Sequence, residues 1–257
     1  MKTVYGPVSS WRLGKSLGVD LICSKDKICS FDCVYCQLGK TSIKTIERKK
    51  FISIDKMRKD IAESLETTDP DVITLSGTGE PTLAKNIDLA IKTIREITDI
   101  PVAILTNSTL LGDKDVQKAL FEIDRVVAKL DASNEKLFQD INKPVEGINL
   151  NDTIAGIKDF KEKFSGRLDI QTMFIKNNMD FAEDIADIVS DIEPDEIQIN
   201  TPLRPCEVEP LTEEQLDLIE RKFRDKDLKT ETVYKSEKPK TSPMDKMEIF
   251  KRRRSYK

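Results

Sequence analysis

The sequence contains no histidine among its 257 residues. Histidine is the commonest metal ligand in proteins and a frequent general acid or base. Its absence excludes histidine-based catalytic triads, histidine-ligated zinc and histidine-ligated haem. Any chemistry must therefore use cysteine, carboxylates, lysine, tyrosine or a bound cofactor.

Long apolar segments are missing as well. No apolar run reaches the roughly 20 residues that a transmembrane helix needs, and the first residues, Met1 to Pro7, lack the apolar region of a secretory signal. We therefore expect a cytoplasmic protein with no membrane partner. In such a reducing compartment, the five cysteines indicate metal binding or catalysis rather than disulfides.

The net charge of −4 is unevenly distributed: residues 235–257 hold nine Lys or Arg and three Asp or Glu, a balance of +6 that leaves −10 for the rest. Such asymmetry is typical of an acidic body with a basic tail that meets an anionic partner. The tail can form a short helix whose Met247, Ile249 or Phe250 would dock on the body. Lys251 to Arg254 would then contact RNA phosphates, and a solvated, frayed terminus is the alternative.

Three cysteines, Cys29, Cys33 and Cys36, stand close together at the spacing C-x3-C-x2-C. This spacing suits a short loop around one compact metal centre, as in iron–sulfur proteins. A cubane with three protein ligands would leave one iron open for a small molecule. A structural zinc site with Cys23 as fourth ligand is the alternative, although zinc sites usually use paired C-x2-C knuckles and only one such pair is present.

These cysteines, with Tyr35 directly before the last, resemble the signature of the radical SAM superfamily. The resemblance implies that Cys29, Cys33 and Cys36 hold a [4Fe–4S] cluster whose open iron chelates S-adenosylmethionine through its amino and carboxylate groups. It also implies that an electron, from a donor such as ferredoxin or flavodoxin, cleaves the sulfonium and releases a 5′-deoxyadenosyl radical. Tyr35 would pack near the adenine.

Beyond the cysteines, strand patterns alternate with helical stripes such as Met57, Ile61 and Leu65. Strands that alternate with helices indicate a parallel sheet of βαβ units. The family resemblance implies an α/β fold of the partial (βα)6 TIM-like barrel type, and a doubly wound open sheet is the alternative. The six expected strands cover residues 19–23, 71–76, 102–106, 125–131, 168–175 and 196–200.

We expect three parts in the chain. Residues 1–18 would form an N-terminal segment that plugs one end of the core, residues 19–210 the barrel, and residues 211–257 a C-terminal helix with the basic tail. Short motifs within residues 4–210, including Ile141-Asn142-Lys143-Pro144, resemble a radical SAM group related to archaeal wyosine-base synthases. That resemblance makes tRNA a candidate substrate, and a peptide or a small molecule is the alternative.

The second predicted strand runs into Gly77, Thr78, Gly79 and Glu80. Glycines at a strand end let the backbone approach a ligand closely. The stretch resembles the glycine-rich motif of the family, which implies that its backbone and Glu80 engage the amino group of the methionine moiety. We expect Gly79→Val to keep the cluster and to lose S-adenosylmethionine cleavage, whereas an ordinary turn would tolerate the change.

Polar residues end the next two strands. Thr106 and Asn107 end the third strand, and Asp131 ends the fourth. Barrel enzymes place their ligand contacts at these strand ends. We therefore expect Thr106, Asn107 and Asp131 to contact the cofactor, and helix capping is the alternative.

The last three strands each have one apolar and one polar face, because side chains alternate along a strand. Polar faces that carry Lys129, Gln171 and Asn200 indicate a cavity for a cofactor and a polar substrate. Lys129 and Cys206 are the candidate catalytic residues, since a lysine in a partly dry cavity can titrate or bind an anion. An ion pair between Lys129 and Asp131, and an inert buried thiol at Cys206, are the alternatives.

These features together predict a radical SAM iron–sulfur enzyme that reductively cleaves S-adenosylmethionine to modify an unidentified substrate. The alternative from another class is a non-enzymatic zinc or iron–sulfur binding module.

Overall fold

The structure, a computed structural model, describes residues 1–252. Its centre is an eight-stranded sheet in the order β1-β2-β5-β6-β7-β8-β9-β10. β1 and β2 pair antiparallel, and the other neighbours pair parallel. The strands are β1 (Val4–Ser10), β2 (Gly14–Val19), β5 (Val72–Leu75), β6 (Val102–Thr106), β7 (Arg125–Lys129), β8 (Arg167–Met173), β9 (Glu196–Asn200) and β10 (Thr230–Thr232).

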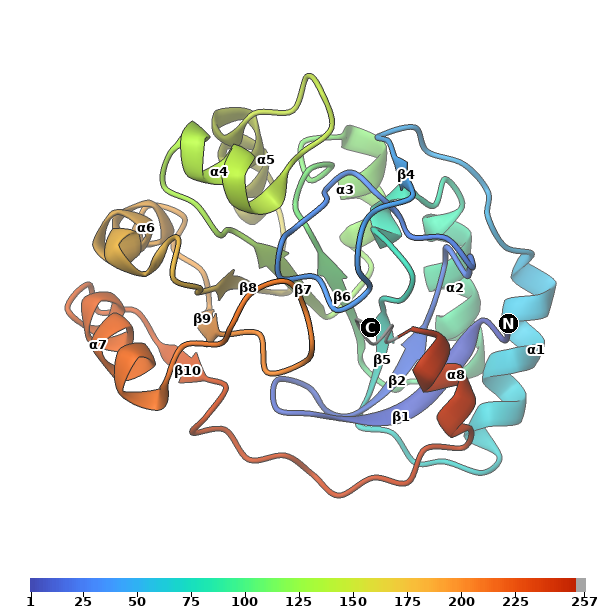
Figure 1. The fold of residues 1–257 in the computed structure, drawn as a ribbon. Helices are drawn as coiled ribbons and strands as arrows, with labels where there is room; N and C mark the ends of the chain where they lie inside the picture. The colour runs from blue at the N-terminus through green and yellow to red at the C-terminus, as the bar shows by residue number, and fades with distance from the viewer. Residues whose placement is uncertain (253–257) are drawn as a thin grey trace.

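The sheet curls into a half-barrel with most of the helices around its outer face (Figure 1). This arrangement confirms the partial barrel and not the doubly wound sheet, in which helices cover both faces. A separate two-stranded ribbon consists of β3 (Ile28–Cys29) and β4 (Ile43–Lys44). The helices are α1 (Ile54–Leu65), α2 (Ile87–Ile97), α3 (Lys114–Leu120), α4 (Glu135–Asn142), α5 (Leu150–Lys161), α6 (Ala182–Ser190), α7 (Glu213–Arg224) and α8 (Lys246–Lys251), with 3-10 turns at Pro81–Leu83 and Met179–Phe181.

The core lies between the sheet and this outer layer of helices. Val126 and Ala128 of β7 are fully buried, as are Ile87, Ile91 and Ile94 along one stripe of α2. The alternate residues of the strands face the inside of the half-barrel. Strand parity therefore separates a packed apolar layer from an inner face that is free to bind ligands.

The start of the barrel differs from the prediction. The first parallel strand is Gly14–Val19, and residues 20–23 form a loop rather than a strand. β1 and β2 form a hairpin across residues 4–19, where the sequence predicted no strand before Val19. Gly18 is required inside β2, because a Cβ there would lie 2.2 Å from the Tyr5 ring. The prediction also missed α4 and β10.

The sheet does not close, since β1 and β10 are its edges. The segment after β10 crosses the open side and ends in α8, which packs on β1 (Figure 1). The prediction that apolar residues of the tail dock on the body is wrong for Met247 and Phe250, which are 63% and 66% exposed. Ile249 is half-buried, and the side chain that inserts most deeply is Arg252, only 3% exposed.

The basic run of the tail is partly used within the protein. Lys251 pairs with Glu248, and so does Arg252. Arg253 and Arg254 lie outside the described residues. The contact between this run and RNA stays a prediction. Within residues 1–252, no helix combines the length and apolar character that a membrane crossing requires.

Candidate active site

Cys29 is the last residue of β3, and Cys33 and Cys36 follow in the loop between β3 and β4. Residues 29–36 together form the cysteine loop. α4 anchors this loop: Val34 N donates to Ile141 O at 3.0 Å. The ring of Phe31 packs edge-on against Phe138, with 5.3 Å between the ring centroids. The helix that the sequence did not reveal therefore fixes the shape of the cysteine loop.

Three of the four cysteines considered for a metal site share one wall. Cys29, Cys33 and Cys36 all line the same cavity. Cys23, the fourth ligand of the zinc site considered from the sequence, donates instead to Lys2 O at 3.3 Å and is not among the described residues of that wall. Three thiols that face one space fit a cluster with three protein ligands.

Hydrogen-bond donors point at two of the sulfur atoms. Asn107 Nδ2 lies 3.5 Å and Phe31 N lies 3.4 Å from Cys29 Sγ. Asn142 Nδ2 lies 3.5 Å from Cys33 Sγ. Donors of this kind stabilise thiolates and tune the potential of a bound cluster.

The buried thiols of the cysteine loop need positive charge nearby in order to ionise. Burial raises the pKa of Cys29 strongly and that of Cys33 to about 11, so these thiols are neutral on their own. Coordination to metal ions deprotonates such thiols. Lys27 adds a buried cation: burial lowers its pKa, but the sulfurs of Cys36, Cys29 and Cys33 outweigh this effect and raise it.

The Gly77–Glu80 loop packs directly against the residue before the first cysteine. Glu80 N donates to Ile28 O at 3.1 Å. A Cβ on Gly79 would stand 1.7 Å from Ile28 O, and one on Gly77 would stand 2.1 Å from Asp20 Cγ. Both glycines are therefore required for contacts within the protein itself.

Glu80 brings together residues that the sequence had placed separately. Its Oε1 accepts from Thr106 Oγ1 at 2.8 Å and from Thr82 Oγ1 at 2.7 Å, and its Oε2 accepts from Asn107 N at 2.7 Å. Burial raises the pKa of Glu80, although these bonds oppose the shift. Glu80, Thr106 and Asn107 thus form one buried group, and their contact with the cofactor stays a prediction.

A second group surrounds Tyr35. Its hydroxyl donates to Asp131 Oδ2, which also accepts from Asn142 Nδ2 at 2.7 Å. Burial, reinforced by the Asp131 charge, raises the pKa of Tyr35 well above its usual value. Lys129 Nζ lies 4.7 Å from the Tyr35 ring centroid, 3.2 Å from Asp131 Oδ1 and 2.9 Å from Gln171 Oε1. The ion pair considered as the alternative role of Lys129 is thus present.

A cavity of about 420 Å³ occupies the inside of the half-barrel. It extends from the cysteine loop to the turn between β1 and β2. Lys129, Gln171 and Asn200 line it, as the polar strand faces predicted. The wall also contains the three cysteines, residues of the glycine loop and several basic side chains. These residues are Arg12, Cys29, Cys33, Tyr35, Cys36, Gly77, Gly79, Glu80, Thr106, Asn107, Met173, Arg204, Lys238 and Arg252.

Cys206 lies beside this cavity rather than in its wall. Within residues 1–252 the wall includes Leu203 and Arg204 but not Cys206. The Cys206 thiol donates to Val208 O at 3.1 Å and is half-buried. A catalytic role for Cys206 would require this loop to move.

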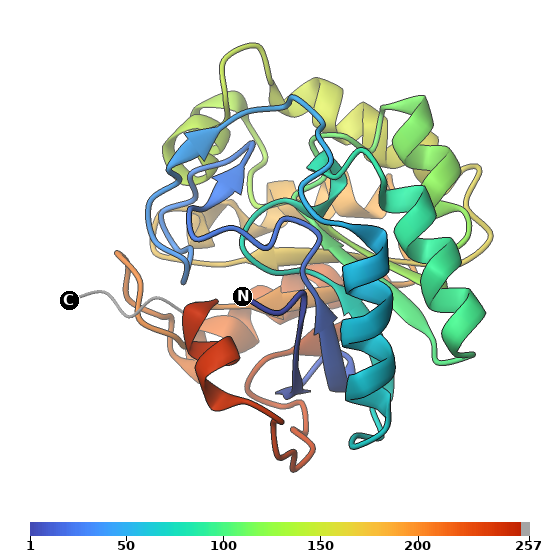
Figure 2. The same cartoon turned by 90° about the vertical axis from the view of Figure 1, so that its right-hand side faces the viewer.

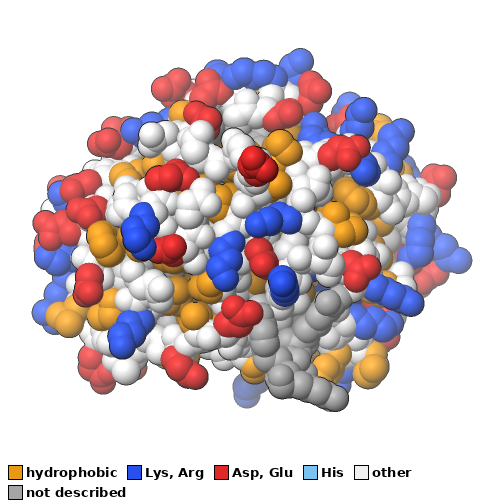
Figure 3. Space-filling model, turned by 45° about the horizontal axis from the view of Figure 1, so that its top comes forward, with side chains coloured by type: hydrophobic (Ala, Val, Ile, Leu, Met, Phe, Trp, Pro, Cys, Tyr) orange, Lys and Arg blue, Asp and Glu red, His pale blue; other side chains and the backbone are white. Residues whose placement is uncertain are grey.

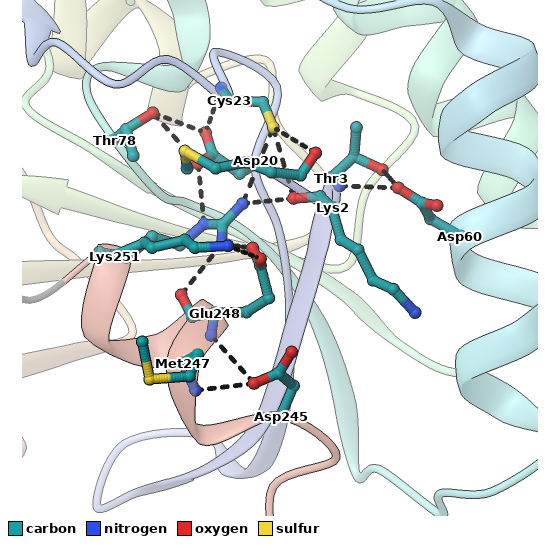
Figure 4. A network of polar contacts seen from close by, with 12 residues as sticks. Lys2, Thr3, Asp20, Cys23, Asp60, Thr78, Asp245, Met247, Glu248 and Lys251 are labelled. Atoms are coloured by element: carbon teal, nitrogen blue, oxygen red, sulfur yellow. Dashed lines mark hydrogen bonds and ion pairs between the residues drawn. The ribbon is translucent and has the colours of Figure 1, made fainter.

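Asp20 supports the glycine loop from the other side (Figure 4). Thr78 Oγ1 donates to Asp20 at 3.1 Å, and Asp20 Oδ1 accepts from Cys23 N at 2.8 Å. Arg252 Nε lies 2.9 Å from Asp20 Oδ2, and Arg252 Nη1 lies 2.9 Å from Glu248 Oε2. The C-terminal helix is therefore tied to the loop that carries Thr78.

The chain matches a known protein family. A family model described as the radical SAM superfamily matches residues 27–189, more than half of the chain. The chain belongs to the radical SAM superfamily. The protein is therefore an enzyme of this class, with a [4Fe–4S] cluster and S-adenosylmethionine as its cofactors and with the need for an electron donor.

The chain is also similar to curated relatives, and its fold is similar to those of solved structures. The chain is 41% identical over 203 residues to a UPF0026 protein of Synechocystis sp., covering 79% of this chain and 76% of the relative. The fold resembles Streptococcus suis SuiB bound to precursor peptide SuiA, with a TM-score of 0.66, 16% identity and coverage of 86% of this chain and 49% of that one. Native anSMEcpe with bound AdoMet gives a TM-score of 0.65, 16% identity and coverage of 85% and 64%.

In this radical SAM protein, the sequence did not predict a role in the active site for Lys27, Asn142, Asp20 or Arg252. Lys27 stands two residues before Cys29, so its nearness to the cysteines was the one available signal. The other three act through contacts between distant segments. The resemblance to wyosine-base synthases stays a prediction.

The Arg252 contact can be tested through stability. Arg252→Met should lower the free energy of unfolding by about 3 kcal/mol, because it leaves Asp20 and Glu248 without their buried cation. Urea denaturation measures this change. The matched control is Lys251→Met, which removes a more exposed partner of the same Glu248 and should cost under about 1 kcal/mol. Equal losses in the two variants would contradict the role of Arg252.

Proposed function

We propose that this enzyme reductively cleaves S-adenosylmethionine at a cluster held by Cys29, Cys33 and Cys36, and that the resulting radical modifies a substrate inside the half-barrel. The observation that carries the proposal is the shared cavity. One wall joins the three cysteines, the glycine loop and the polar strand faces. Cofactor and substrate would therefore meet in one enclosed space.

A cluster held by Cys29, Cys33 and Cys36 would supply the single electron that cleaves S-adenosylmethionine reductively, and the products would be methionine, 5′-deoxyadenosine and a substrate that has lost one hydrogen atom. The protein's own residues would bind the cofactor and shield the reacting atoms from solvent. Glu80, an acceptor in the wall near Cys29, would receive the amino group of the methionine moiety, and Thr106 and Asn107 hold its carboxylate in place. Enclosure keeps water and side reactions away from the reactive species.

Residues around Tyr35 would define the adenosine side of the space. The Tyr35 hydroxyl is fixed by Asp131, so the ring holds one orientation beside the cysteine loop. Lys129 borders both this ring and the open cavity. It is the substrate-side candidate, because its ammonium group can bind an anion or steer a polar group.

The test is anaerobic reconstitution followed by reduction with dithionite. Protein that is brown and that converts S-adenosylmethionine to 5′-deoxyadenosine and methionine supports the proposal. Colourless protein that binds one tight zinc ion and forms no 5′-deoxyadenosine would overturn it in favour of a binding module. In the cell, the electron would come from a small donor such as ferredoxin or flavodoxin, and reduced ferredoxin should replace dithionite in the assay.

A further inference from the structure

The wall of the cavity is strongly basic. Among residues 1–252 it includes six basic side chains and one acidic side chain, whereas the whole chain carries a net charge of −4. On the face shown in Figure 3, acidic and basic side chains are interspersed. The charge of the cavity wall is therefore opposite in sign to the net charge of the chain. The seven residues are Arg12, Lys27, Lys129, Arg204, Lys238, Arg252 and Glu80.

Three of the enclosed cations already have partners. Arg252 pairs with Asp20, Lys129 pairs with Asp131, and Lys27 lies beside the cysteine sulfurs. The one carboxylate in the wall, Glu80, is held by its own hydrogen bonds. The protein itself balances the charge of these groups, although Lys129 still borders the open cavity.

Arg12, in the turn between β1 and β2, is different. Within residues 1–252 its guanidinium makes no ion pair, and its Nε is buried without a hydrogen-bond partner. Its guanidinium lies over the Trp11 ring, with 5.4 Å between Arg12 Cζ and the ring centroid. The neighbouring Arg125, which donates to Arg12 O at 3.1 Å, is instead paired with Asp169 and Glu196.

The surroundings of Arg12 are unfavourable to its charge. Burial, followed by the charges of Arg204 and Arg125, lowers its pKa to about 10, and Glu231 offsets only part of this effect. Arg12 is half-buried, with its Nε fully covered, and a partly desolvated charge without a partner reduces stability unless something pairs with it. An anion that enters the cavity would remove this cost.

Arg12 also lies away from the cofactor end of the cavity. Its carbonyl contacts Arg125 at the amino end of β7, and Lys129 at the other end of the strand stacks on Tyr35 in the cysteine loop. Four residue steps along a strand span roughly 13 Å. Arg204, which bonds Gln37 of the cysteine loop, also lines the cavity and adds positive charge to the same space.

We propose that Arg12 is the binding site for an oxyanion group of the substrate, a phosphate or a carboxylate. The planar guanidinium fork matches both groups. The site is far enough from the cysteines to hold the distal part of a substrate whose reactive carbon lies beside the cofactor. This assignment rests on the proposed function, because it names the substrate class of that same cavity.

The test uses Trp11, the only tryptophan of the chain. Full-length protein with its cluster is titrated with inorganic phosphate and, separately, with acetate at constant ionic strength, while the Trp11 fluorescence is followed. We expect a saturable change with at least one of the two anions. Phosphate alone indicates a phosphate ester as substrate, acetate alone indicates a carboxylic acid, and either result supports the site.

Variants decide whether Arg12 causes the signal. Arg12→Gln should weaken anion binding at least tenfold, and Arg12→Lys should give an intermediate loss. The matched control is Lys15→Gln on the same hairpin, whose ammonium pairs with Asp69 and Asp71 outside the cavity, and it should bind as the unmodified protein does. No saturable response to either anion, or equal binding by Arg12→Gln and the unmodified protein, would overturn the proposal.

A thermal melt separates a binding role from a structural one. Arg12→Gln removes a half-buried charge that makes no ion pair within residues 1–252, so its melting temperature without anions should equal or exceed that of the unmodified protein. Saturating anion should raise the melting temperature of the unmodified protein only. A lower melting temperature for Arg12→Gln, with no anion effect in either protein, would assign Arg12 to the fold. The titration does not measure 5′-deoxyadenosine, so its failure leaves the cleavage proposal standing and is distinct from failure of that proposal.

Discussion

Protein with Cys33→Ala should leave anaerobic reconstitution with iron and sulfide contents near zero. Only Cys29, Cys33 and Cys36 lie in the loop that α4 shapes, and removal of one thiolate leaves two ligands for four irons. Neither Cys23 nor Cys206 reaches this group, because their thiols donate to backbone carbonyls elsewhere. The measurement is iron and sulfide per chain, together with the visible spectrum.

Two variants serve as controls for the loss of one sulfur. Cys23→Ala and Cys206→Ala remove half-buried thiols of the same chain and should retain full cluster content. Production of 5′-deoxyadenosine should fall to background in Cys33→Ala and persist in Cys23→Ala. Full iron content in Cys33→Ala would contradict the assignment of the cluster ligands.

Gly79→Ala should lose both the cluster and S-adenosylmethionine cleavage. One added methyl group would stand 1.7 Å from the carbonyl oxygen of Ile28, so the backbone before Cys29 must move. Overpacking of this kind costs about 3 kcal/mol. The sequence alone predicted that Gly79→Val would spare the cluster, because the glycine was assigned to the approach of a ligand. The carbonyl of Ile28 overturns that expectation.

The matched control for this change is Gly112→Ala. A Cβ on Gly112 would meet its nearest atom, Gly156 Cα, at 3.6 Å, an ordinary contact distance. This variant should keep its cluster and at least half of the cleavage rate. If Gly79→Ala binds iron as well as Gly112→Ala does, the two loops are free to separate and the packing argument fails.

Most of the predictions from the sequence came from patterns among a few neighbouring residues. The spacing of Cys29, Cys33 and Cys36 lies within eight residues, and strands β5 to β9 each show their apolar residues within four to seven. Side-chain alternation along the strands is enough to place Lys129 and Asn200 on the cavity face. These inferences need no knowledge of distant contacts.

Contacts between distant segments explain what the sequence did not reveal. Asn142 reaches Cys33 across 109 residues, and Arg252 reaches Asp20 across 232. An asparagine at a helix end or an arginine in a basic tail has an ordinary explanation by itself. The unpaired state of Arg12 is also invisible in sequence, because it depends on which carboxylates the fold gives to Arg125 instead.

The contact between Asp20 and Arg252 has a consequence for the order in which the enzyme is made. A ribosome produces the chain from its amino end, and early segments begin to fold while later ones are still being synthesised. Asp20 emerges soon after β2, but its cation arrives only after all eight strands of the main sheet. Arg252 also donates to Lys2 O at 2.6 Å, which brings the two ends of the described chain together (Figure 2). The loop that carries Thr78 is therefore fully braced only after every strand of the main sheet has been synthesised, so a nascent chain can form its sheet before it has a finished cofactor site.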